Sequence, residues 1–105
     1  MEPKNRLGIY RVNVQNIETV KDDERWIRMD YTADWISGSD FLPTGAKFRT
    51  HFDLDWRGDI GRLDGFCKSA AVKDWESLRW KSFNASFFAV DGHISMFPAP
   101  SREFN

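Results

Sequence analysis

The chain lacks a second cysteine, an excess of charge of either sign, and any long apolar run. Its only cysteine, Cys67, leaves no intramolecular disulfide, so stability has to come from packing. The 15 Lys and Arg residues nearly balance 16 Asp and Glu residues, whereas nucleic-acid binders usually carry a basic excess. No stretch approaches the roughly 18 apolar residues of a membrane span, and the N-terminus has no apolar signal region. We therefore expect a cytoplasmic protein without a membrane segment.

Motifs of catalysis and cofactor binding are missing as well. The sequence has no G-x-S-x-G nucleophile elbow, no phosphate-binding loop and no G-x-G-x-x-G turn after a strand. Of the two histidines, His93 lies beside an expected tight turn, where a surface position is the ordinary one. The sequence therefore favours a protein that is not an enzyme and holds no cofactor.

Aromatic residues are abundant, at 15% of the 105 residues, with nine Phe, five Trp and two Tyr. Large rings bury much area per residue, which suits the compact core of a single small domain. Trp and Tyr are also enriched at binding hot spots. Rings that the core does not need are therefore candidate anchors for a partner.

Alternation of apolar and polar residues predicts strands over 6–14, 26–35 and 46–56. Segments 15–25 and 36–45 are polar or interrupted by Gly and Pro, and are expected as loops. Within the second loop, the two apolar residues are expected to plug the end of the core; they are Phe41 and Leu42. In the second strand, every other residue is expected in the core: Ile27, Met29, Tyr31, Ala33 and Trp35.

The second half of the chain predicts one helix and one hairpin. Segment 57–65 is rich in Gly and Asp and cannot be a regular strand, whereas apolar residues recur at helical spacing over 69–80 and predict a helix there. Residues 86–90 and 93–97, joined by Asp91-Gly92, predict a hairpin with a two-residue type I′ turn. One face of that hairpin is too apolar for simple exposure, so we expect the helix or a partner to cover it. Its residues are Phe88, Val90, His93, Ser95 and Phe97.

These segments predict a single α+β domain spanning residues 1–105. We expect an antiparallel sheet of about five strands with one packed helix, in the order β-β-β-α-β-β. The alternative is an all-β barrel or sandwich in which residues 78–90 are largely strand. A homo-oligomer could form in either case through a free edge strand.

One strand face carries the chemistry that could bind a metal. His51, Asp53 and Asp55 alternate along 46–56, and an imidazole with two carboxylates can hold a divalent ion or move protons. Such neighbours lie roughly 6–7 Å apart, so convergence on one ion needs bending or further ligands. A wet face of paired charges is the simpler interpretation. Residues 53–64 also match several positions of an EF-hand calcium loop, but Arg57 replaces an oxygen ligand, and we attribute the match to chance.

The function favoured by these observations is docking on a macromolecular partner, as immunity proteins and phage-encoded inhibitors of similar size do. Trp26 shares its strand face with Arg28, and Trp80 lies off the apolar stripe of the predicted helix. Both rings are therefore expected to anchor a protein partner. A basic partner would be steered by an acidic run: Asp22, Asp23 and Glu24.

Two other functions stay open. A small-ligand or metal-binding domain, or an enzyme, would use the face of His51, Asp53 and Asp55 and would need a concave pocket there. A single-stranded nucleic-acid binder would stack bases on Trp and Phe beside Lys47 and Arg49. The neutral net charge and the carboxylates of the same strand make nucleic acid the less favoured partner.

Overall fold

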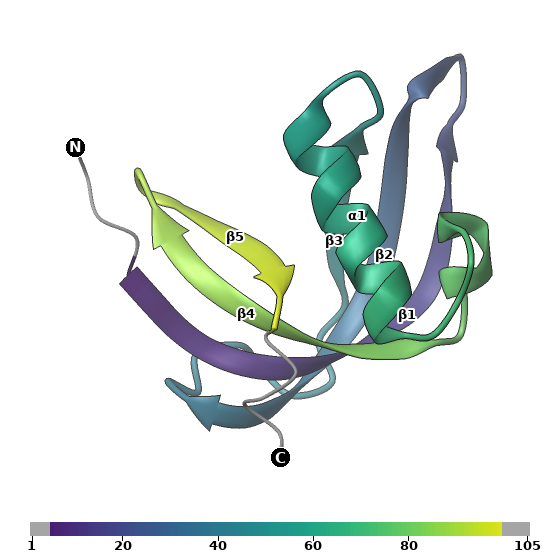
Figure 1. Cartoon of the computed structure of the whole chain (residues 1–105). Helices are drawn as coiled ribbons and strands as arrows, with labels where there is room; N and C mark the ends of the chain where they lie inside the picture. The colour runs from purple at the N-terminus through teal and green to yellow at the C-terminus, as the bar shows by residue number, and fades with distance from the viewer. Residues whose placement is uncertain (1–4, 100–105) are drawn as a thin grey trace.

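Five antiparallel strands and one α-helix make up residues 5–99, the part of the chain that the computed structural model describes (Figure 1). Across the sheet the strands lie in the order β3-β2-β1-β4-β5. The predicted α+β class and the β-β-β-α-β-β order are confirmed. Along the chain the elements are β1 (Asn5–Val20), β2 (Asp23–Gly38), β3 (Phe48–Asp53), α1 (Arg57–Ser69), the 3₁₀ helix η1 (Trp75–Leu78), β4 (Ser82–Val90) and β5 (His93–Pro98).

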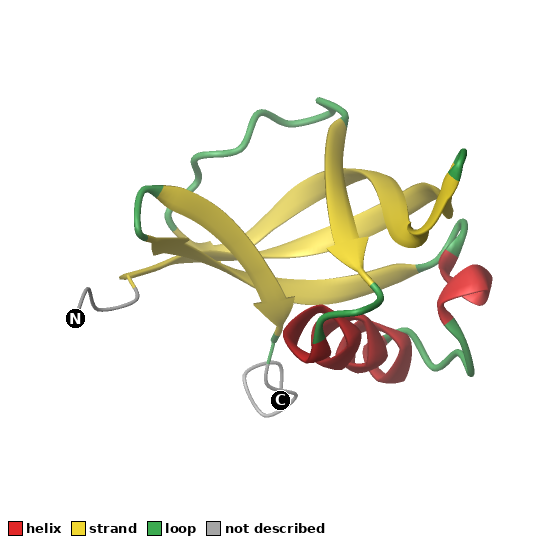
Figure 2. Cartoon of the chain, turned by 90° about the horizontal axis from the view of Figure 1, so that it is seen from above, coloured by secondary structure: helices red, strands yellow, loops and turns green. Residues whose placement is uncertain are grey.

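The sheet is strongly curled, and α1 lies on its concave side (Figures 1 and 2). Both edge strands, β3 and β5, contact this helix, as does β4. The helix therefore covers the open side of the curled sheet, which gives the domain a half-barrel character. The curled sheet also fits the alternative prediction of an all-β barrel, from which the structure differs by its helix.

The core lies between the concave face and α1. Phe66 of the helix stacks on Phe83 of β4 with ring centroids 4.4 Å apart, and its ring meets Phe52 of β3 edge-on at 6.1 Å. The expected alternation of β2 is borne out in four of its five core residues, which are buried: Ile27, Met29, Tyr31 and Ala33. Burial of these rings and aliphatic side chains is the main term that stabilises the fold.

Strand β1 runs six residues further than the alternation predicts. The register with β2 shifts between Val14 and Asn16, so Gln15 is an extra residue in β1. Because a bulge of this kind resets the side-chain alternation, Ile17 returns to the core face although it breaks the spacing of Val12 and Val14. The expected loop over 15–25 is therefore wrong: its residues are mostly strand, joined by a tight turn at 21–22.

The predicted helix over 69–80 is wrong in position: α1 occupies 57–69, for which only a strand had been excluded, and residues 70–81 contain only turns and η1. Glycines at 58, 61 and 65 weigh against a helix in isolation. Tertiary contacts overcome that cost. A Cβ on Gly65 would lie 2.4 Å from Pro98 of β5, so the glycine permits the close approach of helix and edge strand.

A buried ion pair fixes the start of α1. Asp59 is 6% exposed, its Oδ2 accepts from the backbone N–H of Asp53 at 2.7 Å, and its Oδ1 accepts from Arg62 at 2.6 Å. Arg62 also donates to the carbonyl of Met96 at 3.0 Å. One carboxylate and one guanidinium thus tie the helix to both edges of the sheet.

The hairpin of β4 and β5 is confirmed, with Val90 opposite His93 and positive φ at both turn residues, as a type I′ turn requires. The second, apolar face is partly covered. Phe97 meets Phe88 edge-on at 5.5 Å, and the guanidinium of Arg62 lies 5.5 Å from the Phe97 ring. The helix therefore covers one end of that face.

The expected plug is also confirmed at the other end of the core. Phe41 packs edge-on against Tyr10 at 5.5 Å and Phe87 at 6.1 Å, and Leu42 packs on the same cluster. Trp35 is 51% exposed, and its Nε1 donates to the carbonyl of Gly38. The expectation of a buried Trp35 is wrong: it lies near the end of β2, where the register with β1 shifts between Ile9 and Tyr10 and the alternation is interrupted.

Candidate functional site

Trp80 is the most exposed large apolar residue in the described part of the chain, at 76%. It precedes β4 and lies beside β1 at the Gln15 bulge. Its backbone N–H donates to the carbonyl of Val14 at 2.9 Å, while the N–H of Val14 donates to the carbonyl of Lys81 at 2.9 Å. The backbone on both sides is thus held by the sheet, and the ring projects from a fixed position.

The backbone of Trp80 is also strained, with φ at +66°. A residue with a large side chain rarely adopts this left-handed conformation, which costs roughly 1–2 kcal/mol and which glycine adopts freely. The exposed ring offsets little of that cost by packing. Strained residues that the surrounding structure holds in place concentrate at functional sites.

Two cations flank Trp80 in the chain. Arg79 and Lys81 are both exposed, and no ion pair to either side chain is found within residues 5–99. One Nη atom of Arg79 donates to Oδ1 of Asn16 at 2.6 Å, which holds this guanidinium in place. The chain therefore carries a hydrogen-bonded arginine before the tryptophan and an exposed lysine after it.

Asn16 belongs to a longer relay of side chains. Its Nδ2 donates to Glu18 at 2.6 Å, and Glu18 also accepts from Arg28 at 3.2 Å. The Asn16 amide, and then the guanidinium of Arg28, hold the pKa of Glu18 below its ordinary value. The relay joins Arg28, which the sequence had singled out, to Arg79 beside the exposed ring.

The structure separates the two predicted tryptophan anchors. Trp26 is half-buried on β2, opposite Asp53 of β3, and the guanidinium of Arg25 lies 5.4 Å from its ring centroid. Trp80 lies on the other side of β1, so two strand spacings, roughly 10 Å, separate their elements. The predicted acidic run forms the tip of the β1–β2 hairpin and is exposed: Asp22, Asp23 and Glu24.

The strand face with His51, Asp53 and Asp55 is a solvent-facing surface whose two carboxylates pair with Arg25. Asp53 accepts two hydrogen bonds from Arg25, at 2.9 and 2.8 Å, and these bonds hold the pKa of its carboxyl below the ordinary value. His51 lies opposite Arg28. Within residues 5–99 no group of three His, Cys, Asp or Glu side chains is placed to hold a metal ion. The calcium-loop match fails as well, because its second half lies in α1.

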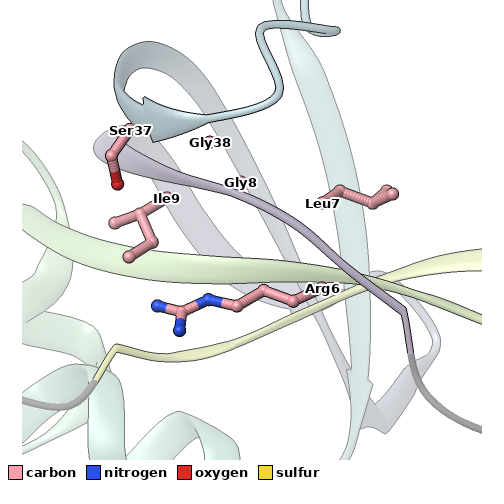
Figure 3. Close-up of a pocket in the computed structure, with 6 residues that line it drawn as sticks. All are labelled: Arg6, Leu7, Gly8, Ile9, Ser37 and Gly38. Carbon is pink, nitrogen blue, oxygen red and sulfur yellow. The ribbon is translucent and has the colours of Figure 1, made fainter.

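Two shallow hollows of the surface have few unpaired charges, and one of them borders Asn16. Figure 3 shows one of about 360 Å³, in which Ile9 and Ser37 point to the same side of the sheet and the Arg6 side chain extends below Ile9. Arg6 is its one charged lining residue and already interacts within the structure. A second, of about 530 Å³, includes Lys47 and Arg49, but Arg49 is paired with Asp30 at 2.7 Å.

No family of known proteins identifies this site. Comparisons with protein-family models, with curated proteins and with solved structures find no match to this chain. Among residues 5–99 there is also no helix of the length and apolarity that crossing a bilayer requires. The functional argument therefore depends on the geometry alone.

The sequence interpretation missed Arg79, Asn16 and Lys81. A signal was present, because Arg79 and Lys81 directly flank Trp80 in the chain. Assignment of 69–80 to a helix hid it, since helix neighbours point in different directions. Asn16 could not be found in this way, because it lies 63 residues from Arg79 and the β1 bulge brings them together.

Proposed function

We propose that this chain is a small, non-enzymatic protein-binding module that docks through Trp80. The observation that carries the proposal is a ring 76% exposed on a backbone strained at φ +66°. Neither property stabilises the free domain, and both suit a rigid hot-spot residue that becomes buried in a complex. An inhibitor or immunity-type protein acts by docking of this kind.

The neighbouring surface supports the proposal. Trp80 lies between two exposed charged residues in the chain, Arg79 and Lys81, which suits an apolar anchor with a polar rim. Arg28 belongs to the relay that reaches Arg79 beside the ring. Trp26 and the acidic run lie near the turn of the β1–β2 hairpin, away from Trp80. Only a larger partner would contact them as well as Trp80.

We propose the cytoplasm as the compartment in which this docking occurs. Cys67 is the chain's single cysteine and is buried, and burial raises the pKa of its thiol. A buried, protonated thiol is inert and needs no partner cysteine. Small secreted domains usually carry paired cysteines, so a single buried free thiol favours a reducing compartment.

Affinity capture from a lysate of the source organism tests the proposal. The wild-type protein, Trp80→Gly and Trp56→Ala are immobilised in turn; Trp56 is 60% exposed and serves as a matched exposed tryptophan. We expect wild type and Trp56→Ala to retain one protein in stoichiometric amount that Trp80→Gly does not retain. The retained protein is then purified and titrated against all three chains.

Equal binding of the purified partner to wild type and Trp80→Gly would refute the proposed anchor. Glycine tolerates the backbone at this position, so a folded Trp80→Gly protein separates loss of binding from loss of structure. Circular dichroism and the unfolding midpoint of each variant provide that control.

A further inference from the structure

The guanidinium of Arg79 is positioned by a series of hydrogen-bonded side chains. Arg79 donates to Asn16, Asn16 donates to Glu18, and Glu18 also accepts from Arg28, at 2.6, 2.6 and 3.2 Å. Each of these four residues has at least one hydrogen-bond partner in the chain. A long arginine side chain on a surface is ordinarily mobile, and its ordering lowers the entropic cost of binding a second group.

Arg79 retains most of its donors for such a group. A guanidinium has five N–H donors in a planar fork, and the one hydrogen bond found for Arg79 within residues 5–99 uses a single Nη atom. The acceptor that matches this fork best is a carboxylate, which accepts two parallel hydrogen bonds. Lys81, which follows Trp80 in the chain, adds a second cation that has no carboxylate partner among residues 5–99.

The charges around the site favour an acidic protein surface over a phosphate backbone. Three other cations of this hairpin and its neighbouring strand β3 are paired with carboxylates, as Arg25–Asp53, Arg28–Glu18 and Arg49–Asp30. Two cations suffice for one or two carboxylates, whereas nucleic-acid binding draws on many phosphate contacts. The acidic hairpin tip would also repel a polyanion that ran along the hairpin.

We propose that the partner presents one or two carboxylates beside the apolar pocket that receives Trp80, and that Arg79 binds one of them through its fork. Asn16 is the positioning residue: it touches the partner only through Arg79. This inference rests on the proposed docking through Trp80 and adds to it the chemistry of the partner. It also reverses the sequence-based expectation of a basic partner.

Selection of a random phage-displayed peptide library on the intact wild-type chain tests the inference without a known partner. We expect enriched peptides to contain Asp or Glu within a few residues of an apolar side chain. A synthetic copy of the strongest peptide is then titrated against wild type, Arg79→Gln, Asn16→Ala, Trp80→Gly and Arg57→Gln. Arg57, an exposed arginine at the start of α1, is the matched control.

Arg79→Gln should weaken the peptide about tenfold and reduce the salt dependence of its affinity, because a charge-assisted pair is lost. Asn16→Ala should weaken it less, about threefold, with the salt dependence retained, since the cation stays but is no longer positioned. Arg57→Gln should bind as wild type does. A role of Asn16 in stability alone would leave the affinity of the folded variant unchanged.

Neutral or basic consensus peptides, or no Trp80-dependent enrichment, would overturn the inference. So would tight, strongly salt-dependent binding of a fluorescent oligothymidylate at about 0.15 M salt that Trp80→Gly abolishes. The two proposals fail separately. A neutral consensus that still needs Trp80 removes only the acidic partner, whereas equal lysate capture by wild type and Trp80→Gly removes the docking surface itself.

Discussion

The strain at Trp80 predicts an inverted order of stability for two small substitutions. Replacement by Gly or by Ala removes the same exposed ring, so the loss of side-chain contacts nearly cancels between the two variants. At an ordinary position, Gly is less stable than Ala by roughly 0.5–1 kcal/mol, because the unfolded chain gains entropy. At φ +66°, Ala keeps a strain of roughly 1–2 kcal/mol that Gly does not have.

The difference of these two terms favours Trp80→Gly over Trp80→Ala by roughly 0 to 1.5 kcal/mol, with a central value of about 0.75 kcal/mol. In a domain of this size the central value corresponds to roughly 3–6 °C in the unfolding midpoint. Urea unfolding of both variants at one temperature, with the slope m compared as a check on two-state behaviour, measures it directly.

An Ala variant that is more stable than the Gly variant by the ordinary amount of roughly 0.5–1 kcal/mol would refute the left-handed backbone at Trp80 and with it the argument from strain. A matched position strengthens the comparison. Ile60 is 46% exposed within α1, where the backbone is helical. There the strain term is absent, so Ile60→Gly should be less stable than Ile60→Ala by about 1 kcal/mol.

Three further predictions concern the core. Gly61→Ala should stabilise the domain by roughly 0.5–1 kcal/mol, because the added Cβ would meet nothing within 4 Å. Gly65→Ala should destabilise it, because the added Cβ would lie 2.4 Å from the ring of Pro98. Equal midpoints of the two variants in thermal unfolding would contradict this helix packing. Asp59→Ala should lower the free energy of unfolding by about 3 kcal/mol, because it leaves the half-buried guanidinium of Arg62 without its carboxylate. The further substitution Arg62→Met should recover part of this loss. A double-mutant cycle that shows no coupling between the two residues would contradict the prediction. Burial raises the pKa of Tyr31 to about 12 from 10.0, so the folded state keeps a proton that the unfolded state loses, and stability should fall as pH rises from 10 to 12. Tyr31→Phe should lack that fall in urea titrations across this range, and parallel curves for both proteins would contradict it.

Unbroken alternation was enough to place much of the sheet. Segments with a strict period of two gave the central parts of β1, β2 and β3, and Asp91-Gly92 gave the final hairpin with its register. These features are local, because each strand residue chooses its face relative to its neighbours and the turn residues supply the required positive φ. The exposure of Trp80 was predicted correctly, although from the wrong secondary structure.

Features that depend on distant residues could not be predicted in this way. The Gln15 bulge breaks the alternation and returns Ile17 to the core, so local periodicity ended the strand six residues too early. The helix contains three glycines, and its stability depends on Phe52, Phe83 and the edge strands that it covers.

The sequence by itself determined the fold class, the chain order of the elements and an aromatic residue that the core does not use. Tertiary structure alone decided how that residue could function. It placed Trp80 in a left-handed conformation beside Val14, and it brought Asn16 next to Arg79, 63 residues further along the chain. The physical reason is the same in both cases: strand pairing across the sheet fixes these backbones, and no local propensity encodes a pairing between distant segments.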